Sequence, residues 1–273
     1  MNNIELIFPE IFISLSIMFL LILGVFKKNS SKIIHNISLL VLLIAAVITF
    51  NETIGISRTI LFNESIVVDY LSSFMKIITL ISAFVVLLIS SNYLKTFKIF
   101  KIEYPILILS SVLGMMIMIS SNDLIVFYMG LELQSLALYV LATFNRDQLK
   151  SSEAGLKYFV LSALSSGLLL YGCSLIYGFT GSTNFYVIAT QFNTNEYALT
   201  FGIVFVLVGL AFKISAVPFH MWAPDVYEGS PTSVTLFFTM VPKIAALTVF
   251  IRFLYVPFLN LIDQWQMILV FLS

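Results

Sequence analysis

Long apolar runs separated by short polar connections cover almost the whole chain. A membrane-spanning helix needs about 20 mostly apolar residues. Eight segments approach or meet this requirement: Ile4–Phe26, Ile33–Phe50, Tyr70–Ser91, Tyr104–Ser120, Leu124–Phe144, Ala154–Phe179, Ala198–Trp222 and Ser233–Tyr255. A ninth begins near Gln266, and the sequence stops within it at Ser273. The pattern therefore predicts an all-α, polytopic transmembrane helix bundle.

Two connections add detail to this prediction. The turn at Asn122–Asp123 between the fourth and fifth segments is very short, so these two helices are expected to pack as an antiparallel hairpin. Asp123 is expected to cap the fifth helix, because aspartate accepts hydrogen bonds from free N–H groups there. Thr183–Phe192 is short and amphipathic, and is expected to lie at the membrane interface.

The stretch Gly209–Leu247 departs from this regular pattern. Two apolar segments flank a polar middle, and the segments contain Lys213 and Lys243 beside Pro218 and Pro242. Proline removes a backbone donor and interrupts a helix. In lipid such a break persists only where protein or water satisfies the freed carbonyls. We therefore expect a discontinuous seventh helix, a polar turn and another helix around an internal hydrated site.

Composition supports a membrane protein. Of the 273 residues, 60% are hydrophobic and 10% are charged, and the mean hydropathy is +1.04. Soluble domains carry about 25% charged residues. The net charge of zero gives no indication of a nucleic-acid partner. Cys173 is the single cysteine, which excludes a disulfide within the chain. The start, MNNIELIFPEIF, lacks the basic region of a signal peptide, so the first helix is expected to be retained.

Basic residues alternate between successive connections. They occur in the first, third and fifth connections: Lys27, Lys28, Lys32, Lys95, Lys98, Lys101, Arg146 and Lys150. The second connection has Arg58 against three acidic residues, and Gly181–Tyr197 has no lysine or arginine. Cytoplasmic connections of membrane proteins are enriched in lysine and arginine. The odd-numbered connections are therefore expected on the cytoplasmic or matrix side, and Met1 on the periplasmic or intermembrane-space side.

Three charged residues fall near the centres of predicted segments: Glu132, Lys213 and Lys243. A charge at mid-bilayer costs about 2.5–3.5 kcal/mol on insertion scales, so such residues are by default functional. Burial disfavours a charged lysine and a nearby carboxylate favours it. We expect Glu132 and Lys213 to form a switchable ion pair, with Lys243 as the next proton carrier. A static ion pair that only holds the bundle together is the alternative.

Other titratable residues are weaker candidates. Lys157 lies near one end of its segment and could carry protons or extend its ammonium to the interface. His220 follows Pro218 and could relay protons, because histidine titrates near neutrality; capping the broken helix is the alternative. Asp225 and Glu228 are expected to be solvated turn or capping groups. The sequence contains no CxxC, HExxH, GxGxxG or Walker motif, so no metal, iron–sulfur, flavin or nucleotide site is expected in this chain.

Three stretches carry a family resemblance: YMGLELQSLALYVLATF, EAGLKYFVLSALSSGLLLYGCSLIYGFTG and FKISAVPFHMWAPDVYEGSPTSV. They resemble the chain 2 or chain N family of NADH:ubiquinone oxidoreductase, respiratory complex I. The resemblance runs through nearly the whole chain and is densest over Tyr128–Lys243. It implies an antiporter-like, proton-translocating subunit of the membrane arm of this enzyme. The family's residues for proton translocation match Glu132, Lys213, Lys243, Lys157 and His220.

The resemblance also implies domain organisation and partners. Residues 1–103 would form an N-terminal three-helix segment, 104–255 the first five-helix antiporter-like repeat, and 256–273 the start of a ninth helix. The second repeat lies outside this sequence, and a continuation or a separate chain would supply it. Partner subunits would hold NADH, FMN, iron–sulfur clusters and ubiquinone, in a mitochondrial inner membrane or a bacterial plasma membrane. A subunit of a multisubunit cation/proton antiporter and a purely structural membrane spacer are the alternative classes.

Overall fold

Helices make up nearly all of the structure, a computed structural model that describes residues 3–27, 30–53, 58–191 and 196–272. The long helices are α1 (Phe8–Phe26), α2 (Ser31–Thr53), α3 (Tyr70–Thr96), α4 (Glu103–Ile119), α5 (Leu124–Ala142), α6 (Leu149–Thr180), α8 (Glu196–Ile214) and α10 (Thr232–Tyr255). Shorter elements are η1 (Asn3–Ile7), α7 (Phe185–Thr190), α9 (Ala223–Gly229), η2 (Leu259–Leu261) and α11 (Ile262–Leu272). The all-α bundle is confirmed, and each of the eight predicted segments corresponds to one long helix.

Seven of the described helices are long and apolar enough to span a membrane, namely α1 with its preceding turn, α2, α3, α5, α6, α8 and α10. The remaining long helix, α4, has 17 residues, at the short end of the range for a span. Large apolar side chains such as Phe19, Leu136 and Leu164 are more than half exposed, as expected of a surface that faces lipid. The chain is a multi-pass membrane protein.

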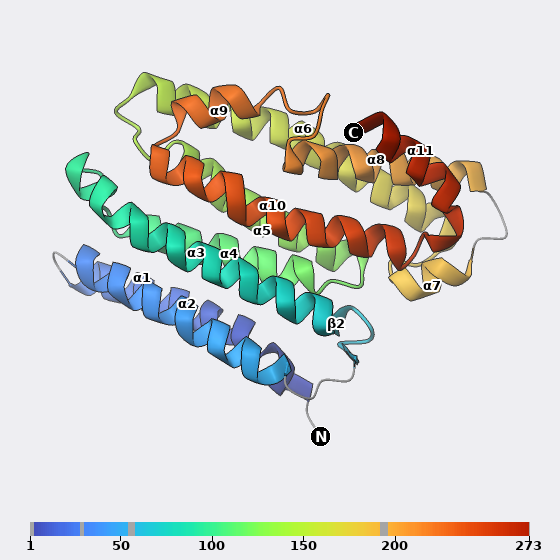
Figure 1. Ribbon diagram of the computed structural model, residues 1–273, viewed down its shortest axis with the longest axis horizontal. Helices are drawn as coiled ribbons and strands as arrows, with labels where there is room; N and C mark the ends of the chain where they lie inside the picture. The colour runs from blue at the N-terminus through green and yellow to red at the C-terminus, as the bar shows by residue number, and fades with distance from the viewer. Residues whose placement is uncertain (1–2, 28–29, 54–57, 192–195, 273) are drawn as a thin grey trace.

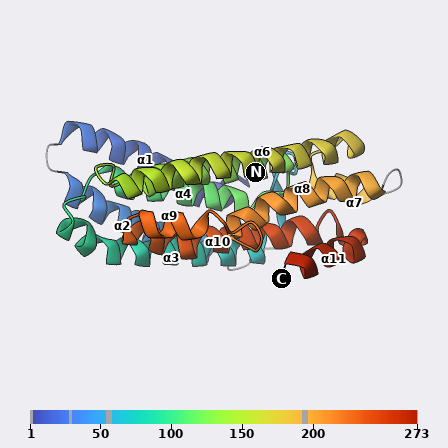
Figure 2. The same cartoon turned by 90° about the horizontal axis from the view of Figure 1, so that it is seen from above.

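The long helices run roughly side by side in two layers. Figure 1 shows them stacked from α1 and α2, through α3, α4, α5 and α10, to α6 and α8. Seen from above in Figure 2, α1, α4 and α6 lie along one side, and α2, α3 and α10 along the other. The predicted N-terminal segment contacts the following helices directly, because α3 packs against α4 and α10 and α1 packs against α4.

Glycines allow α4 and α5 to approach each other closely. In the α4–α5 hairpin, a Cβ added at Gly130 would lie 2.8 Å from the Met118 nitrogen, and one at Gly114 would lie 2.6 Å from the Gln134 nitrogen. Asp123 caps α5 as predicted, since its carboxylate accepts from the Ile125 N–H at 2.7 Å. Small residues that bring helix backbones together are typical of membrane proteins, and the expected hairpin is confirmed.

A small β-ribbon is the main element that the sequence does not predict. Strands β1 (Thr59–Leu61) and β2 (Ile66–Val68) pair antiparallel. The ribbon lies against the α4–α5 turn, where the Asn122 N–H donates to the Ser65 carbonyl at 2.8 Å and its side chain donates to the Glu64 carbonyl at 2.8 Å. Strands of three residues are too short to show a detectable alternation of polar and apolar positions, which is why the second connection reads as a loop.

Two buried ion pairs connect helices that are distant in sequence. Lys76 of α3 lies 2.5 Å from Glu10 of α1, with both side chains almost fully buried. Arg252 of α10 lies 2.8 Å from Asp69, the N-cap of α3. Burial alone would raise the pKa of Asp69. The charge of Arg252 and the hydrogen bonds from Arg252 and Ser72 outweigh burial, so the pKa of Asp69 is lowered below its ordinary value. Asp69 is therefore held in its charged form.

Candidate functional site

Helix α8 ends immediately after Lys213, and the carbonyls of Ala211 and Phe212 near its end are satisfied by the protein itself. Ser215 adopts a left-handed conformation with φ +61°. Its N–H donates to the Phe212 carbonyl at 3.1 Å, and the Ala216 N–H donates to the Ala211 carbonyl at 2.9 Å. This pair of bonds is the Schellman arrangement that closes many helices, usually with glycine at the left-handed position.

An aromatic side chain completes this helix end. The indole N–H of Trp222 donates to the Phe212 carbonyl at 2.9 Å, and the indole stacks on Tyr158 of α6 at 4.6 Å between ring centroids. The discontinuous helix is confirmed. At Ala211 and Phe212 the protein, and not water, satisfies the carbonyls, which accept from N–H groups of the break.

The ammonium of Lys213 is buried between three helices and is held by hydroxyl groups. The residue is 7% exposed. Its Nζ donates to Ser135 Oγ of α5 at 2.7 Å and to Ser162 Oγ of α6 at 2.7 Å. Ser162 Oγ also accepts from the Tyr139 hydroxyl at 2.6 Å, and the Lys213 ammonium lies 5.7 Å from the Tyr139 ring centroid. These four residues form the hydroxyl site.

The expected direct ion pair between Glu132 and Lys213 is not formed. Five ion pairs occur within the described residues, and this pair is not among them. Glu132 is half-buried on α5, and its Oε1 is buried without a hydrogen-bond partner. Ser135 follows Glu132 by three residues and so shares its helix face. Lys213 therefore bonds to the serine of that face, while the carboxylate keeps an unfilled hydrogen-bonding position.

Lys243 lies midway along α10, after Pro242, and the helix continues through both residues. The side chain is half-buried, and its ammonium lies 5.6 Å from the ring centroid of Tyr227 on α9. This distance is within the range of a cation–π contact. Lys243 forms no ion pair with a described carboxylate.

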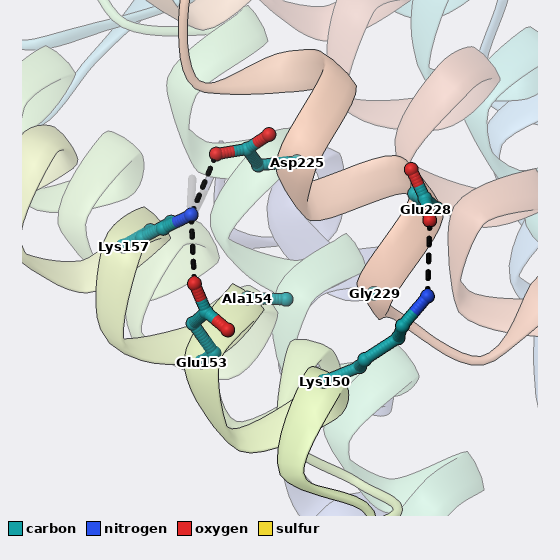
Figure 3. A pocket seen from close by; sticks show the side chains of 7 residues that line it. All are labelled: Lys150, Glu153, Ala154, Lys157, Asp225, Glu228 and Gly229. Atoms are coloured by element: carbon teal, nitrogen blue, oxygen red, sulfur yellow. Dashed lines mark hydrogen bonds and ion pairs between the residues drawn. The ribbon is translucent and has the colours of Figure 1, made fainter.

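The polar stretch after the break is folded into a helix instead of an open turn. Asp225 and Glu228, expected as turn groups, lie on α9 and face α6, as Figure 3 shows. Lys157 of α6 lies 2.7 Å from Asp225 and 2.9 Å from Glu153, and Lys150 lies 3.2 Å from Glu228. These residues line an open pocket of about 140 Å³.

The backbones of α6 and α9 approach closely beside this pocket, since a Cβ added at Gly229 would lie 2.7 Å from the Lys150 carbonyl. Lys157 is exposed. It is therefore paired to the helix that follows the break, and the structure does not place it in the hydroxyl site.

His220 is exposed on the loop between α8 and α9. Its carbonyl accepts from the Ala223 N–H at 2.9 Å, at the start of α9.

Of the five predicted site residues, the structure buries Lys213 fully and Glu132 and Lys243 partly, and leaves Lys157 and His220 on the surface. Across the described residues, no three histidine, cysteine, aspartate or glutamate side chains gather as a metal site requires.

Comparison with known proteins identifies the family. Residues 121–273 match the family model described as NADH:quinone oxidoreductase/Mrp antiporter, transmembrane. The chain belongs to this family. It is 74% identical over 273 residues to NADH-quinone oxidoreductase subunit N of Pelagibacter ubique, covering the whole of this chain and 58% of that protein. The chain thus spans little more than half the length of the curated relatives that it matches.

Solved structures of the family share the fold. A chain of respiratory complex I from Thermus thermophilus is 30% identical, with a TM-score of 0.78 over 89% of this chain and 52% of that one. A chain of the Mrp complex from Dietzia has a TM-score of 0.81, with 23% identity, over 94% of this chain and 50% of that one. The complex I chain is similar in both sequence and fold, whereas the Mrp chain shows similarity of fold alone.

Proposed function

We propose that this chain is part of a proton-translocating membrane-arm subunit of NADH:quinone oxidoreductase, and that protons pass through Glu132, Lys213 and Lys243. The similarity to subunit N relatives along the full chain supports the assignment to this enzyme. The observation that supports the proton path is the buried Lys213 ammonium, bonded to two neutral hydroxyls at the end of a broken helix.

Hydroxyl partners suit a group that changes its charge. A serine hydroxyl accepts a hydrogen bond from an ammonium, and after rotation it donates one to a neutral amine. Lys213 can therefore keep hydrogen bonds in both protonation states, whereas a direct carboxylate partner would stabilise the charged state alone. Glu132 lies one helical turn from Ser135, and its unfilled oxygen offers the place from which a proton is passed to or from this site.

The remaining predicted residues have supporting positions in this proposal. Lys243 is the next carrier, beside the α9 ring of Tyr227. Lys157 and Asp225 connect α6 to the segment after the break, so a change of charge at Lys157 would alter how α9 is held. His220 is exposed on the loop of the break, where it exchanges protons with the solvent or the protein that contacts this loop.

The proposal includes partners and location. Partner subunits hold NADH, FMN, the iron–sulfur clusters and ubiquinone, and other membrane-arm subunits and lipid surround this chain. The second antiporter-like repeat is supplied by a continuation of this polypeptide or by a separate chain. The Pelagibacter ubique relative named above is bacterial, which favours the plasma membrane over the mitochondrial inner membrane. The N-terminal end of α1 faces the periplasm; Met1 itself lies outside the described residues.

The test uses Lys213→Ala and Lys243→Ala in the assembled complex. Each is expected to lower NADH-driven proton pumping by about tenfold, as for ~1.4 kcal/mol added to the barrier, and to lower quinone reduction with it if coupling is tight. Lys101→Ala, an exposed lysine outside the predicted path, is the matched control. Complexes that assemble fully and pump at the wild-type rate in both site variants would contradict the proposed path.

A subunit of a multisubunit cation/proton antiporter is the second candidate, since the family model includes Mrp antiporters. Copurification separates the two. Flavin and iron–sulfur absorbance in the purified assembly supports the first proposal. An assembly of antiporter chains alone, which exchanges Na⁺ for protons without NADH, supports the second.

A further inference from the structure

A second cavity lies between the beginning of α2 and the end of α3, and none of its lining residues belongs to the proposed proton path. Its volume is about 410 Å³. Its polar lining consists of Lys32, His35, Asn36, Asn92 and Lys95, together with Ser91. The apolar wall is formed by Leu39, Leu88 and Phe100.

One polar side chain in this cavity is buried and unpartnered. His35 is 3% exposed, and neither ring nitrogen forms a hydrogen bond with a described residue. A backbone group of Leu87 also lies close to the ring. The ring packs against Phe100 at 5.5 Å between centroids. Buried polar groups are nearly always bonded to protein, water or a ligand, so the cavity is the place from which His35 can be satisfied.

The charges of the cavity select an anion. Lys32 and Lys95 supply two ammonium groups, and Asn36 and Asn92 supply amide donors. None of the nine lining residues is a carboxylate. Lys95 extends over the Phe100 ring, with its ammonium 5.5 Å from the centroid, which holds its stem against the wall. Lysine ammonium groups are common phosphate binders.

The polar and apolar residues of the cavity lie at different depths in the membrane, which favours an amphiphilic ligand. Helix α2 begins at Ser31 and α3 ends at Thr96, so the basic residues lie at the ends of two membrane helices. Leu39 lies eight residues into α2, about 12 Å along the helix, and Leu88 is 52% exposed on α3. The donors are therefore at the level of lipid headgroups, and the leucines are at the level of acyl chains.

We propose that this cavity binds an anionic phospholipid. Its phosphate pairs with Lys32 and Lys95, the His35 ring donates one hydrogen bond to a phosphate oxygen, and an acyl chain lies along Leu39 and Leu88. The site would fasten the α2–α3 pair to the lipid of one leaflet. Its chemistry is independent of proton transfer at Lys213.

The test is native mass spectrometry of the purified protein with its copurifying subunits, titrated with phosphatidylglycerol and, separately, with phosphatidylcholine. Phosphatidylglycerol is expected to bind more tightly. The double variant Lys32→Gln/Lys95→Gln is expected to weaken its binding by roughly thirtyfold or more, because two charge-assisted contacts to the phosphate are lost. The matched control is Lys98→Gln/Lys101→Gln, which removes the same charge from exposed lysines that do not line the cavity.

A charge-neutral variant and a free anion complete the design. His35→Leu removes the ring donor without changing net charge, and is expected to weaken phosphatidylglycerol binding while the control pair binds it as the wild type does. Equal losses in the two lysine pairs would show diffuse attraction and overturn the proposal. Inorganic phosphate that binds through Lys32 and Lys95, with no preference among lipids, would overturn the assignment to a phospholipid.

Discussion

The single residue that the sequence places best is Lys213, and the residues that it places least well are the partners of Lys213. A lysine inside an apolar run beside a proline is conspicuous in a sequence. Ser135 and Ser162 are not, because small polar residues in membrane helices also serve close packing. Their role emerges only when three helices bring both hydroxyls within 2.7 Å of one ammonium.

The first prediction tests these hydroxyls. Ser162→Ala removes one of the two hydroxyl partners of Lys213 and the acceptor of the Tyr139 hydroxyl. A hydrogen bond to a charged group contributes about 1.5–3 kcal/mol, so NADH-driven proton pumping is expected to fall roughly tenfold or more in a complex that still assembles. Ser166→Ala is the matched control, since this α6 hydroxyl donates to the Ala163 carbonyl of its own helix. Equal pumping rates in the two variants would exclude Ser162 from the path.

The second prediction concerns the buried pair of Glu10 and Lys76. The sequence offers a similar signal here as at Lys213, a lysine inside an apolar segment, and its partner likewise lies on another helix. Glu10→Gln leaves the Lys76 charge buried and is expected to destabilise the protein by about 3–5 kcal/mol. The double variant Glu10→Gln/Lys76→Met removes that charge and is expected to recover most of the loss. Thermal unfolding in detergent measures both, and a double variant no more stable than the single one would contradict this account.

At the scale of elements, the close approach of α4 and α5 gives a third prediction. Gly130→Ala places a methyl group 2.8 Å from the Met118 nitrogen, and backbone must shift to admit it. Overpacking of this kind costs about 1–3 kcal/mol, so the unfolding temperature is expected to fall. Gly178→Ala is the control, because a Cβ there meets no atom within 4 Å. An unfolding temperature that does not change in Gly130→Ala would show that the hairpin is looser than this contact requires.

Helix positions follow from the sequence because membrane spans have a length and composition that few other elements share. At helix ends and breaks, length and composition do not decide where a helix stops, because proline, capping and packing act there together. The prediction ends the seventh segment at Trp222, whereas α8 ends at Ile214 and the remainder is a capped break. Helix α9 has seven residues and contains Pro224 and Gly229, so it reads as a turn, and contacts with α6 decide its conformation.

At the scale of the whole molecule, the two ends of the bundle differ in charge. Figure 1 shows β2 and α7 at one end, and the end of α1, the start of α2, the α5–α6 connection and the end of α3 at the other. The second end carries the basic connections; Lys28 of the first connection and Phe192 of the expected interfacial segment lie outside the described residues. At the first end Arg58 lies 4.7 Å from the Tyr186 ring centroid. The bundle thus gathers the basic connections at one boundary, as the alternation along the sequence requires.

The last prediction assigns these ends to the two sides of the membrane. Lysine and arginine accumulate in cytoplasmic connections, so the end with Lys95, Lys98 and Lys101 is expected to face the cytoplasm, and α7 the periplasm. The single cysteine allows a clean test, in which Cys173→Ser provides a cysteine-free background. In intact cells an impermeant thiol reagent is expected to label Thr190→Cys, an exposed position at the end of α7, and to leave Lys101→Cys unlabelled until the membrane is opened. Labelling of Lys101→Cys alone in intact cells would reverse the orientation, and with it the side from which protons enter the path.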